Sequence, residues 1–146
     1  MNDFRPVSPA VDQRIRNSFA TQSMMTTLGA ELVHVAAGAT EIHAPILPGS
    51  RQQHGFAHAG LTFAIGDSAA GYAALSVMPE DHEVLTTEMK IHLLAPGKGD
   101  LLIARGKVIK PGRRLVIVQA DVFARIEGKD THIAMMTGTM IPLAPA

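Results

Sequence analysis

The clearest pattern in the chain is an uncharged stretch from Ala59 to Met78, interrupted by one acid, Asp67. Small and apolar residues would occupy nearly every face of a helix formed by this stretch, so such a helix should be covered by protein on most sides. Pro79 follows directly, and proline disfavours the helical conformation of the residue before it. We therefore predict a long buried helix over about residues 57–77.

The same stretch is long enough to span a bilayer. It contains Gly60, Gly66 and Gly71, however, and the Asp67 carboxylate at mid-bilayer would cost roughly 2.5–3.5 kcal/mol on insertion scales. A helix buried inside a folded domain explains the pattern without this cost. We therefore expect no membrane partner.

The residues before this helix predict a second helix and a hairpin. Apolar residues recur roughly along one helical stripe at Val11, Ile15, Phe19 and Met25. This stripe predicts a helix over about residues 11–27 that stops at Gly29. Residues 31–37 and 40–46 are rich in Val, Ile and Thr, and the turn at Gly38 between them favours a β-hairpin.

The C-terminal half shows the two-residue alternation of strands. Alternation runs through residues 87–93 and 116–126, and turns rich in Pro and Gly delimit further strands at about 101–109 and 131–141. We predict a four-stranded meander after the long helix. Because crossover helices are too few for a parallel sheet, the fold class is α+β. We expect one domain over residues 1–146, with a helical extension at its N-terminus (residues 1–29).

Composition narrows the classes of function. The 146 residues are 47% hydrophobic, carry no formal net charge and include no cysteine. Zero net charge gives no field that would attract nucleic acid or anionic lipid, so we expect neither as a partner. Without cysteine there is no disulfide, thiolate metal site or cysteine nucleophile. The N-terminus has no apolar run behind a basic stretch, so we expect no signal peptide and a cytoplasmic protein.

Asp67 is the first candidate for chemistry, because a carboxylate in an uncharged helix must be desolvated or find a partner. It could be a general base or nucleophile, or a structural acid bonded to a backbone group or across a subunit interface. His58 precedes it by nine residues, about two and a half turns, which is too far for a His–Asp pair in one chain. Asp67 would therefore act at a site built with another chain or another loop.

His58 stands at the start of the long helix, where backbone N–H groups lack internal partners and the helix dipole is positive. Such an end can hold a developing oxyanion, although a capping or packing role also explains a histidine there. His54 and His58 have the spacing of a metal pair, but Gly55 lies between them and no acidic ligand is nearby, so we expect no metal. Residues 66–71 lack the G-x-S-x-G pattern of a nucleophile elbow, and the chain has no P-loop.

Basic residues cluster at the predicted turns: Lys110, Arg113, Arg114 and Lys129. They could meet the phosphates of a nucleotide-bearing substrate, or they could be solvated turn charges.

Three segments together carry a family resemblance: QQHGFAHAGLTFAIGDSAAGYAAL, VLTTEMKIHLLAPGKGD and VIKPGRRLVIVQADVF. In this order they resemble the phenylacetate-degradation (PaaI-type) branch of the hotdog thioesterases, over about residues 31–142. The resemblance implies a hotdog fold, in which an antiparallel sheet wraps a long central helix, here with an extra N-terminal helix. It also implies hydrolysis of acyl-CoA, without a cofactor, in an active site shared between subunits of a homodimer or homotetramer.

The resemblance also implies roles for individual residues. The backbone N–H of Ala59 would polarise the thioester carbonyl, and Asp67 would activate water or attack the carbonyl. Gln52 and Thr86 would orient substrate or water, and His58 would shape the loop. Substrate-binding roles are expected for Gly60, Lys110, Arg113 and Arg114.

Two residues depart from the usual family pattern. Ala59 replaces the first glycine of His-Gly-Gly, and Gln52 stands where many members have asparagine. Alanine keeps the N–H, so the oxyanion contact survives. The departures bear on substrate range and rate more than on the reaction class.

We therefore expect a thioesterase that acts on small, medium or aromatic acyl-CoA. The alternative is a non-catalytic acyl-CoA-binding hotdog protein with a sensing or regulatory role, which would bind its ligand without turnover. A hydratase or dehydratase is a third possibility, but the chain lacks the paired Asp and His spacing of that family. An unpaired edge strand would favour a homo-oligomer, because pairing across a two-fold axis covers such an edge.

Overall fold

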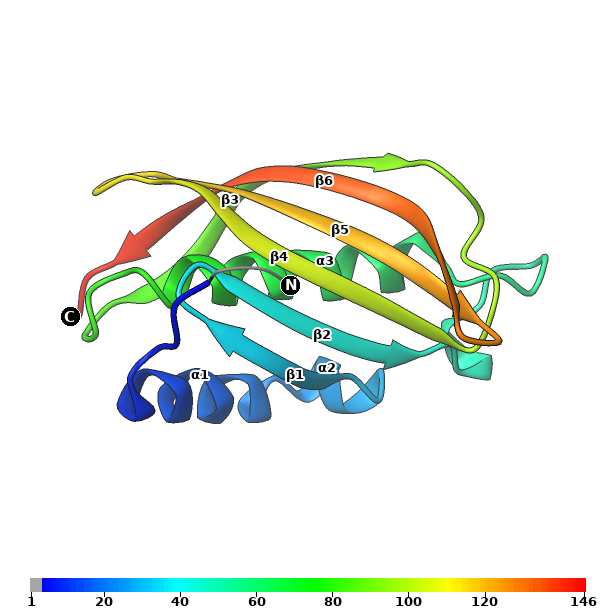
Figure 1. Cartoon of the computed structure of the whole chain (residues 1–146), viewed down its shortest axis with the longest axis horizontal. Coiled ribbons are helices and arrows are strands. Elements are labelled where there is room, and N and C mark those ends of the chain that lie inside the picture. The colour runs from blue at the N-terminus through cyan, green and yellow to red at the C-terminus, as the bar shows by residue number, and fades with distance from the viewer. Residues whose placement is uncertain (1–3) are drawn as a thin grey trace.

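A computed structural model describes residues 4–146, in which a curved six-stranded antiparallel sheet wraps one long helix, α3 (Ala59–Leu75) (Figure 1). Two short helices, α1 (Pro9–Thr21) and α2 (Ser23–Thr27), lie beside the first strand at the lower side of Figure 1. The strands are β1 (Glu31–Ala36), β2 (Ala39–Pro45), β3 (Glu83–Leu93), β4 (Leu101–Pro111), β5 (Val116–Ile126) and β6 (Lys129–Leu143). The α+β class and the wrapped-helix arrangement of the hotdog fold are confirmed.

The strand order, β1-β2-β4-β5-β6-β3, differs from the predicted meander. β3 pairs with β6, so that Leu85 lies opposite Ile141, and it does not pair with β4. β4 instead lies between β2 and β5, and Ile42 of β2 lies opposite Ala104. Alternation of apolar and polar residues indicates which segments are strands, but it does not indicate their neighbours. The predicted chain-order pairing is therefore wrong for β3, whereas β4, β5 and β6 do pair in chain order.

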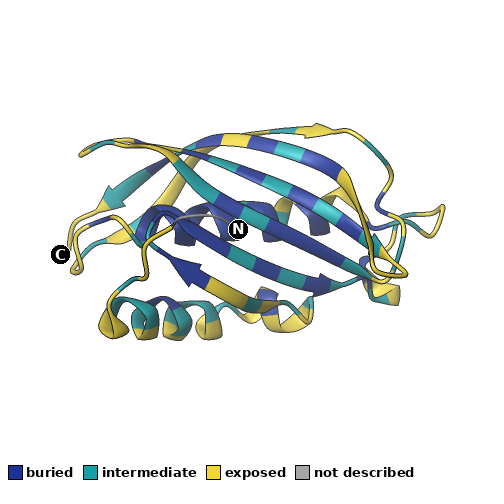
Figure 2. Cartoon of the chain, in the orientation of Figure 1, coloured by how far each residue is buried: buried dark blue, intermediate teal, exposed yellow. Residues whose placement is uncertain are grey.

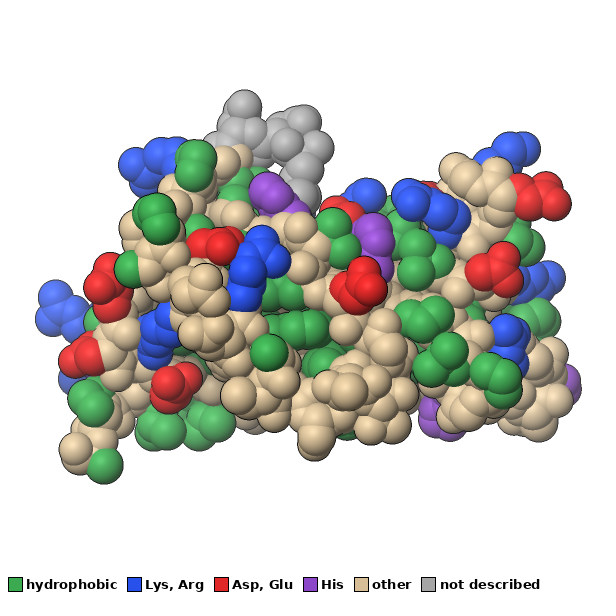
Figure 3. All heavy atoms as spheres, turned by 90° about the horizontal axis from the view of Figure 1, so that it is seen from below, with side chains coloured by type: hydrophobic (Ala, Val, Ile, Leu, Met, Phe, Trp, Pro, Cys, Tyr) green, Lys and Arg blue, Asp and Glu red, His purple; other side chains and the backbone are tan. Residues whose placement is uncertain are grey.

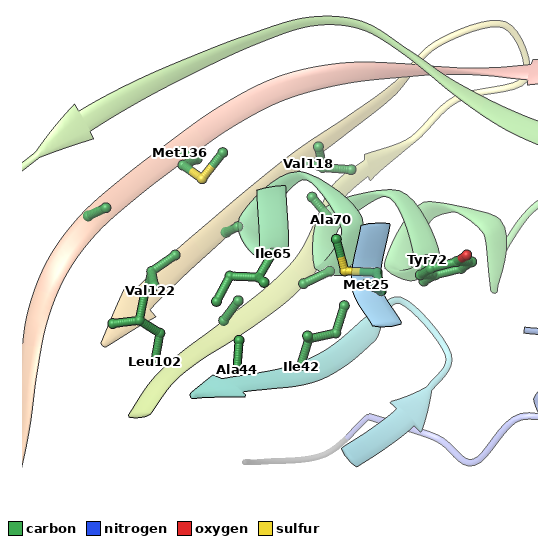
Figure 4. Close-up of a cluster of buried hydrophobic side chains, with 14 of the residues drawn as sticks. Met25, Ile42, Ala44, Ile65, Ala70, Tyr72, Leu102, Val118, Val122 and Met136 are labelled. Carbon is green, nitrogen blue, oxygen red and sulfur yellow. The ribbon is translucent and has the colours of Figure 1, made fainter. Parts of the chain in front are cut away.

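Helix α3 is shorter than predicted at both ends, starting after His58 and ending at Leu75. Its core-facing side packs against the sheet, where Ile65 and Ala70 lie close to side chains of β4 and β5 (Figure 4). Gly106 of β4 lies so close to the helix that an added Cβ would stand 2.3 Å from the carbonyl carbon and oxygen of Ala69. No helix within residues 4–146 has the length and hydropathy needed to cross a membrane.

The predicted N-terminal helix is divided into two at Gln22, whose backbone is extended (φ −76°, ψ 96°). Ile15 of α1 and Met25 of α2 are both buried, as their stripe indicated. Phe19 meets Tyr72 of α3 edge to face, with ring centroids 6.1 Å apart. These contacts fix α1 against the C-terminal half of α3. The face that carries α1 mixes acidic, basic and apolar side chains, without a broad area of one charge (Figure 3).

Strand β3 forms one edge of the sheet and is exposed along most of its 11 residues (Figure 2). Two of its leucines, Leu85 and Leu93, are 50% and 59% exposed. Such an edge presents unpaired backbone N–H and C=O groups that a second strand can satisfy. The other edge strand, β1, has only six residues, and α1 packs beside it.

Candidate active site

His58 caps the start of α3. Its backbone is extended, and its Nδ1 accepts a hydrogen bond from the Gly60 N–H at 2.7 Å. A ring that accepts at Nδ1 carries its proton at Nε2. A Cβ at Gly60 would stand 2.9 Å from this Nδ1, so glycine permits the close approach. The structure therefore gives His58 the capping role and uses the Gly60 N–H for that cap.

The Ala59 N–H is the first donor of the helix. The His58 carbonyl accepts from Leu61 and Thr62, and the His58 ring accepts from Gly60. Within residues 4–146, no acceptor lies within hydrogen-bonding distance and angle of the Ala59 N–H. A donor at the positive end of a 17-residue helix is suited to a negatively charged oxygen.

Gln52 holds the loop that leads into α3. Its side-chain Oε1 accepts from the backbone N–H groups of His54 (2.6 Å) and Phe56 (3.2 Å). Its own backbone N–H donates to the Phe56 carbonyl at 2.9 Å. These bonds leave the side-chain NH₂ group of Gln52 as the part that can face a ligand.

Gln52, His58 and Ala59 line one pocket of about 570 Å³. Apolar side chains and backbone form most of the remaining wall: Phe56, Ala57, Leu93, Leu94, Ala95, Pro96, Gly97 and Ile133. The exposed Lys98 places its Nζ 5.2 Å from the centroid of the Phe56 ring. Lys98 was not among the predicted site residues, although the turn that contains it was predicted as a turn.

Asp67 lies two turns further along α3 and is half-buried. Burial raises the pKa of its carboxyl above the ordinary value, and a hydrogen bond from Thr86 partly opposes the rise. The Thr86 hydroxyl donates to Asp67 Oδ1 at 2.8 Å. The contact joins α3 to the edge strand β3 and brings together two of the residues that the family resemblance singled out.

Asp67 and Thr86 line a second, smaller pocket of about 260 Å³. Most of its lining is polar: Ser18, Thr21, Gln22, Ser68, Tyr72 and Glu83, together with Gly71 and Val84. The polar residues from α1 and from the far part of α3 were not predicted. No spacing in the sequence links Gln22 to Tyr72, whose hydroxyl accepts from Gln22 Nε2 at 2.7 Å.

Within one chain, the acid and the helix start do not share a pocket. Eight residues separate Ala59 from Asp67, about 12 Å along a helix axis. The prediction that His58 and Asp67 cannot form a pair in one chain agrees with this arrangement.

The predicted substrate-binding cations lie elsewhere. Lys110 lies near the end of β4, and Arg113 and Arg114 lie in the turn between β4 and β5. All three are exposed, and they line neither pocket described above. Their role remains a prediction. Within residues 4–146, no three His, Cys, Asp or Glu side chains gather as metal ligands would.

Comparison with known families identifies residues 54–130 as a match to the family described as the Thioesterase superfamily. This segment contains the end of the loop before α3, the whole of α3 and the whole of strands β3, β4 and β5. A thioesterase family protein from Silicibacter pomeroyi has a similar structure, with a TM-score of 0.91 and 41% sequence identity, covering 92% of this chain and 99% of that chain.

Two further relatives are more distant. A mutant of the phenylacetic acid degradation protein PaaI from Thermus thermophilus has a TM-score of 0.71 and 26% identity, covering 82% of this chain and 98% of that chain. The protein SSO1253 of Saccharolobus solfataricus, whose name suggests an esterase, is 30% identical over 87 residues. That match covers 60% of this chain and 55% of SSO1253, so the chain spans about half the length of this curated relative.

Proposed function

The chain belongs to the thioesterase superfamily, and on that premise we propose that it hydrolyses the thioester of an acyl-CoA to a free acid and CoA. The observation that carries the proposal is the environment of Asp67. This carboxyl is half-buried in a helix with no other charge, its pKa is raised by burial, and Thr86 orients it. Such a group is suited to take a proton from water near neutral pH.

The Ala59 N–H supplies the second element of the reaction. It would donate to the carbonyl oxygen of the thioester, and the bond would strengthen as that oxygen becomes negative in the transition state. The positive end of the helix dipole acts in the same direction. His58, by capping the helix and holding the Gly60 N–H, fixes the direction of the Ala59 donor in advance.

Asp67 would act as the general base. Thr86 holds Oδ1, which leaves Oδ2 free to accept a proton from water. The water oxygen bonds to the carbonyl carbon, and the resulting tetrahedral intermediate breaks its C–S bond. The departing CoA thiolate then takes the proton from Asp67, which restores the carboxylate.

We further propose that the site is completed by a second copy of the chain. Asp67 of one copy would act on a carbonyl held by Ala59 of the other, because one chain keeps these groups in different pockets. The exposed edge of β3, which continues into the Leu93–Leu94 wall of the larger pocket, provides a surface for that pairing. A two-fold axis would then create two equivalent sites in a homodimer, and further pairing could give a tetramer.

The substrate would carry a small, medium or aromatic acyl group. The pocket of about 260 Å³ beside the catalytic acid has a size that suits such a group.

Release of CoA, followed with a thiol reagent over a panel of acyl-CoA esters, tests the proposal. The chain has no cysteine and gives no background in this assay. Asp67→Asn should lower turnover by about 10²–10⁴, the contribution of a positioned acid–base group. An unchanged rate would exclude Asp67 as the base. Saturable binding of acyl-CoA without any CoA release would instead favour a non-catalytic binding protein.

The oxyanion donor can be removed with little disturbance of the helix. Ala59 is the first helical residue, where proline is well tolerated, and His58 already has the extended backbone that precedes proline (φ −64°, ψ 141°). Ala59→Pro deletes the N–H and should lower turnover by about 10²–10³. Ala59→Gly keeps the N–H and is the matched control, which should stay within a few-fold of the native rate.

A further inference from the structure

The Thr86 hydroxyl has a second acceptor besides Asp67. Its Oγ1 lies 2.8 Å from Asp67 Oδ1 and 3.2 Å from the sulfur of Met140 on β6. A hydroxyl group carries one hydrogen, so a full hydrogen bond to one acceptor excludes a full bond to the other. A carboxylate accepts a strong hydrogen bond, whereas a thioether sulfur accepts a weak one. The Thr86 hydroxyl therefore lies between a strong acceptor whose charge can change and a weak acceptor whose charge cannot.

The pairing of β3 with β6 places the Met140 sulfur beside Thr86. The two residues lie directly opposite each other in the ladder, so their side chains leave the same face of the sheet. Met140 is fully buried, and its Cε would lie 3.9 Å from a Cβ at Gly71. Gly71 follows Asp67 by four residues, about one helical turn. The Met140 side chain therefore packs under α3 at the point where β3 meets the helix.

Protonation of Asp67 changes which acceptor the hydroxyl prefers. While the carboxyl is ionised, Oδ1 is much the better acceptor, and the bond from Thr86 lowers the Asp67 pKa. Once the carboxyl is protonated it is neutral, and its oxygens accept more weakly. The Thr86 hydrogen can then turn to the Met140 sulfur without losing a partner in the interior of the protein. The sulfur therefore favours the neutral form of Asp67 over the ionised form.

The other titratable groups around Asp67 do not account for its raised pKa. Glu83 of β3 and Tyr72 of α3 line the same pocket, and Arg14 of α1 pairs with Glu83 at 3.4 Å. Residues 133–143 of β6 include no titratable side chain. The rise in the Asp67 pKa follows from burial, and none of these groups is among its causes within residues 4–146. The neighbours that matter for Asp67 are therefore the uncharged ones.

We propose that Met140 is a positioning residue for the general base, and that its sulfur accepts the Thr86 hydrogen whenever Asp67 is protonated. This inference rests on the proposed thioesterase function, in which Asp67 takes a proton from water and passes it to the departing thiolate. The hydroxyl would alternate between its two acceptors once in each catalytic cycle, so that neither form of Asp67 leaves it unpaired. Because Met140 is uncharged, it can affect Asp67 only through this hydrogen bond or through burial.

A titration of the Asp67 carboxyl carbon by ¹³C NMR tests the inference. The protein is labelled in its aspartates, and Asp67→Asn identifies the signal. Met140→Leu deletes the sulfur and nearly conserves the side-chain volume. The Asp67 pKa should fall by about 0.5 in this variant, the effect expected of one weak hydrogen bond. The acidic limb of the kcat/KM profile should move to lower pH by the same amount.

Met136→Leu is the matched control. Met136 lies on the same strand and is also fully buried against the core (Figure 4). Its sulfur has no hydrogen bond from Thr86, so the Asp67 pKa should stay unchanged in this variant. Met140→Ile gives a second test if Met140→Leu does not fold, because isoleucine also lacks a sulfur and suits a strand.

A double variant separates the hydrogen bond from burial. If the sulfur acts through the hydroxyl, adding Met140→Leu to Thr86→Val should not change the Asp67 pKa any further. An unchanged or higher pKa in Met140→Leu alone would overturn the inference. The same fall in the Thr86→Val background would also overturn it, since Met140 would then act through packing.

The titration requires no turnover, so it is read separately from the proposed function. If no acyl-CoA ester releases CoA, the thioesterase function fails, and the catalytic use of Met140 fails with it. If CoA is released but the Asp67 pKa does not respond to Met140→Leu, the thioesterase function stands and only the role of Met140 is rejected.

Discussion

The Thr86 hydroxyl donates to the Asp67 carboxylate at 2.8 Å, across the junction between the edge strand β3 and the central helix α3. Burial and this bond act on the pKa of Asp67 in opposite directions, and burial has the larger effect. The bond also selects which carboxylate oxygen stays available. The pKa of the proposed base therefore depends on two independent features, the burial of Asp67 and the hydrogen bond from the Thr86 hydroxyl.

Thr86→Val should raise the pKa of Asp67 further, because it removes a donor that favours the ionised form. A general base works only when ionised, so kcat/KM falls as the pH drops through this pKa. The acidic limb of the pH profile should therefore move to higher pH in the variant. Thr87→Val is the control, since the Thr87 hydroxyl bonds the Thr139 carbonyl instead. An acidic limb that stays in place or moves to lower pH would contradict this role of Thr86.

Asp67→Asn should raise the melting temperature at neutral pH, although it lowers turnover. A carboxyl whose pKa is raised by folding destabilises the folded state at pH values above that pKa, and the penalty disappears as the pH falls and the group is protonated. The amide carries no charge, and its oxygen can still accept from Thr86. The difference in melting temperature between the variant and the native protein should therefore shrink towards acidic pH. Thermal unfolding over a pH series measures this difference. Asp100→Asn, at an exposed position, should show no such gain.

The elements of the fold follow closely from local patterns, while their arrangement does not. Residues 116–126 alternate apolar and polar side chains and form β5 with the expected bounds. The break at Gln22 has no glycine or proline to mark it, and the side-chain contact made there is with Tyr72, 50 residues away. The position of β3 beside β6 depends on which strand edges remain free after β2, β4 and β5 have paired, a property of the whole sheet.

For the candidate site, too, the sequence indicated the residues that stand out locally and missed those that depend on contacts between distant segments. Asp67 was evident as the one charge in an apolar helix, and Ala59 and His58 as the start of that helix. Thr86 was indicated only by the family resemblance, because nothing in its own segment distinguishes it from Thr87. The contact between Gln22 and Tyr72 and the position of Lys98 beside Phe56 join distant segments of the chain, so no local sequence pattern predicts them.

His58→Ala should destabilise the protein by about 1 kcal/mol, the usual cost of removing a helix cap. The ring accepts from the Gly60 N–H, and alanine would leave that donor unpartnered. His58→Asn offers a short side chain that caps well, and it should recover most of the loss. Urea unfolding of the three proteins makes the comparison. Equal stability of the alanine and asparagine variants would indicate that the cap contributes nothing.

Gly106→Ala should destabilise the protein by about 1–3 kcal/mol, because its Cβ would stand 2.3 Å from the Ala69 backbone and force α3 away from β4. Gly71→Ala is the matched control, since its Cβ would meet only Met140 Cε at 3.9 Å, an ordinary contact. Alanine inside a helix also gains about 0.5–1 kcal/mol over glycine. In thermal unfolding, Gly106→Ala should melt at a lower temperature than the native protein, and Gly71→Ala at a higher temperature. A tolerated Gly106→Ala would show that the sheet can move away from the helix without loss.

Mixing two inactive variants should restore activity if the site is shared between copies. Asp67→Asn removes the base and Ala59→Pro removes the oxyanion donor, so a hybrid dimer would hold one site with both groups intact and one with neither. Random exchange of subunits makes half of the dimers hybrids, which gives about a quarter of the native activity. The mixture is unfolded, refolded together and assayed for CoA release, with each variant refolded alone as the control. If both groups acted within one chain, no mixture could recover activity, and the proposed pairing through β3 would have no role in catalysis.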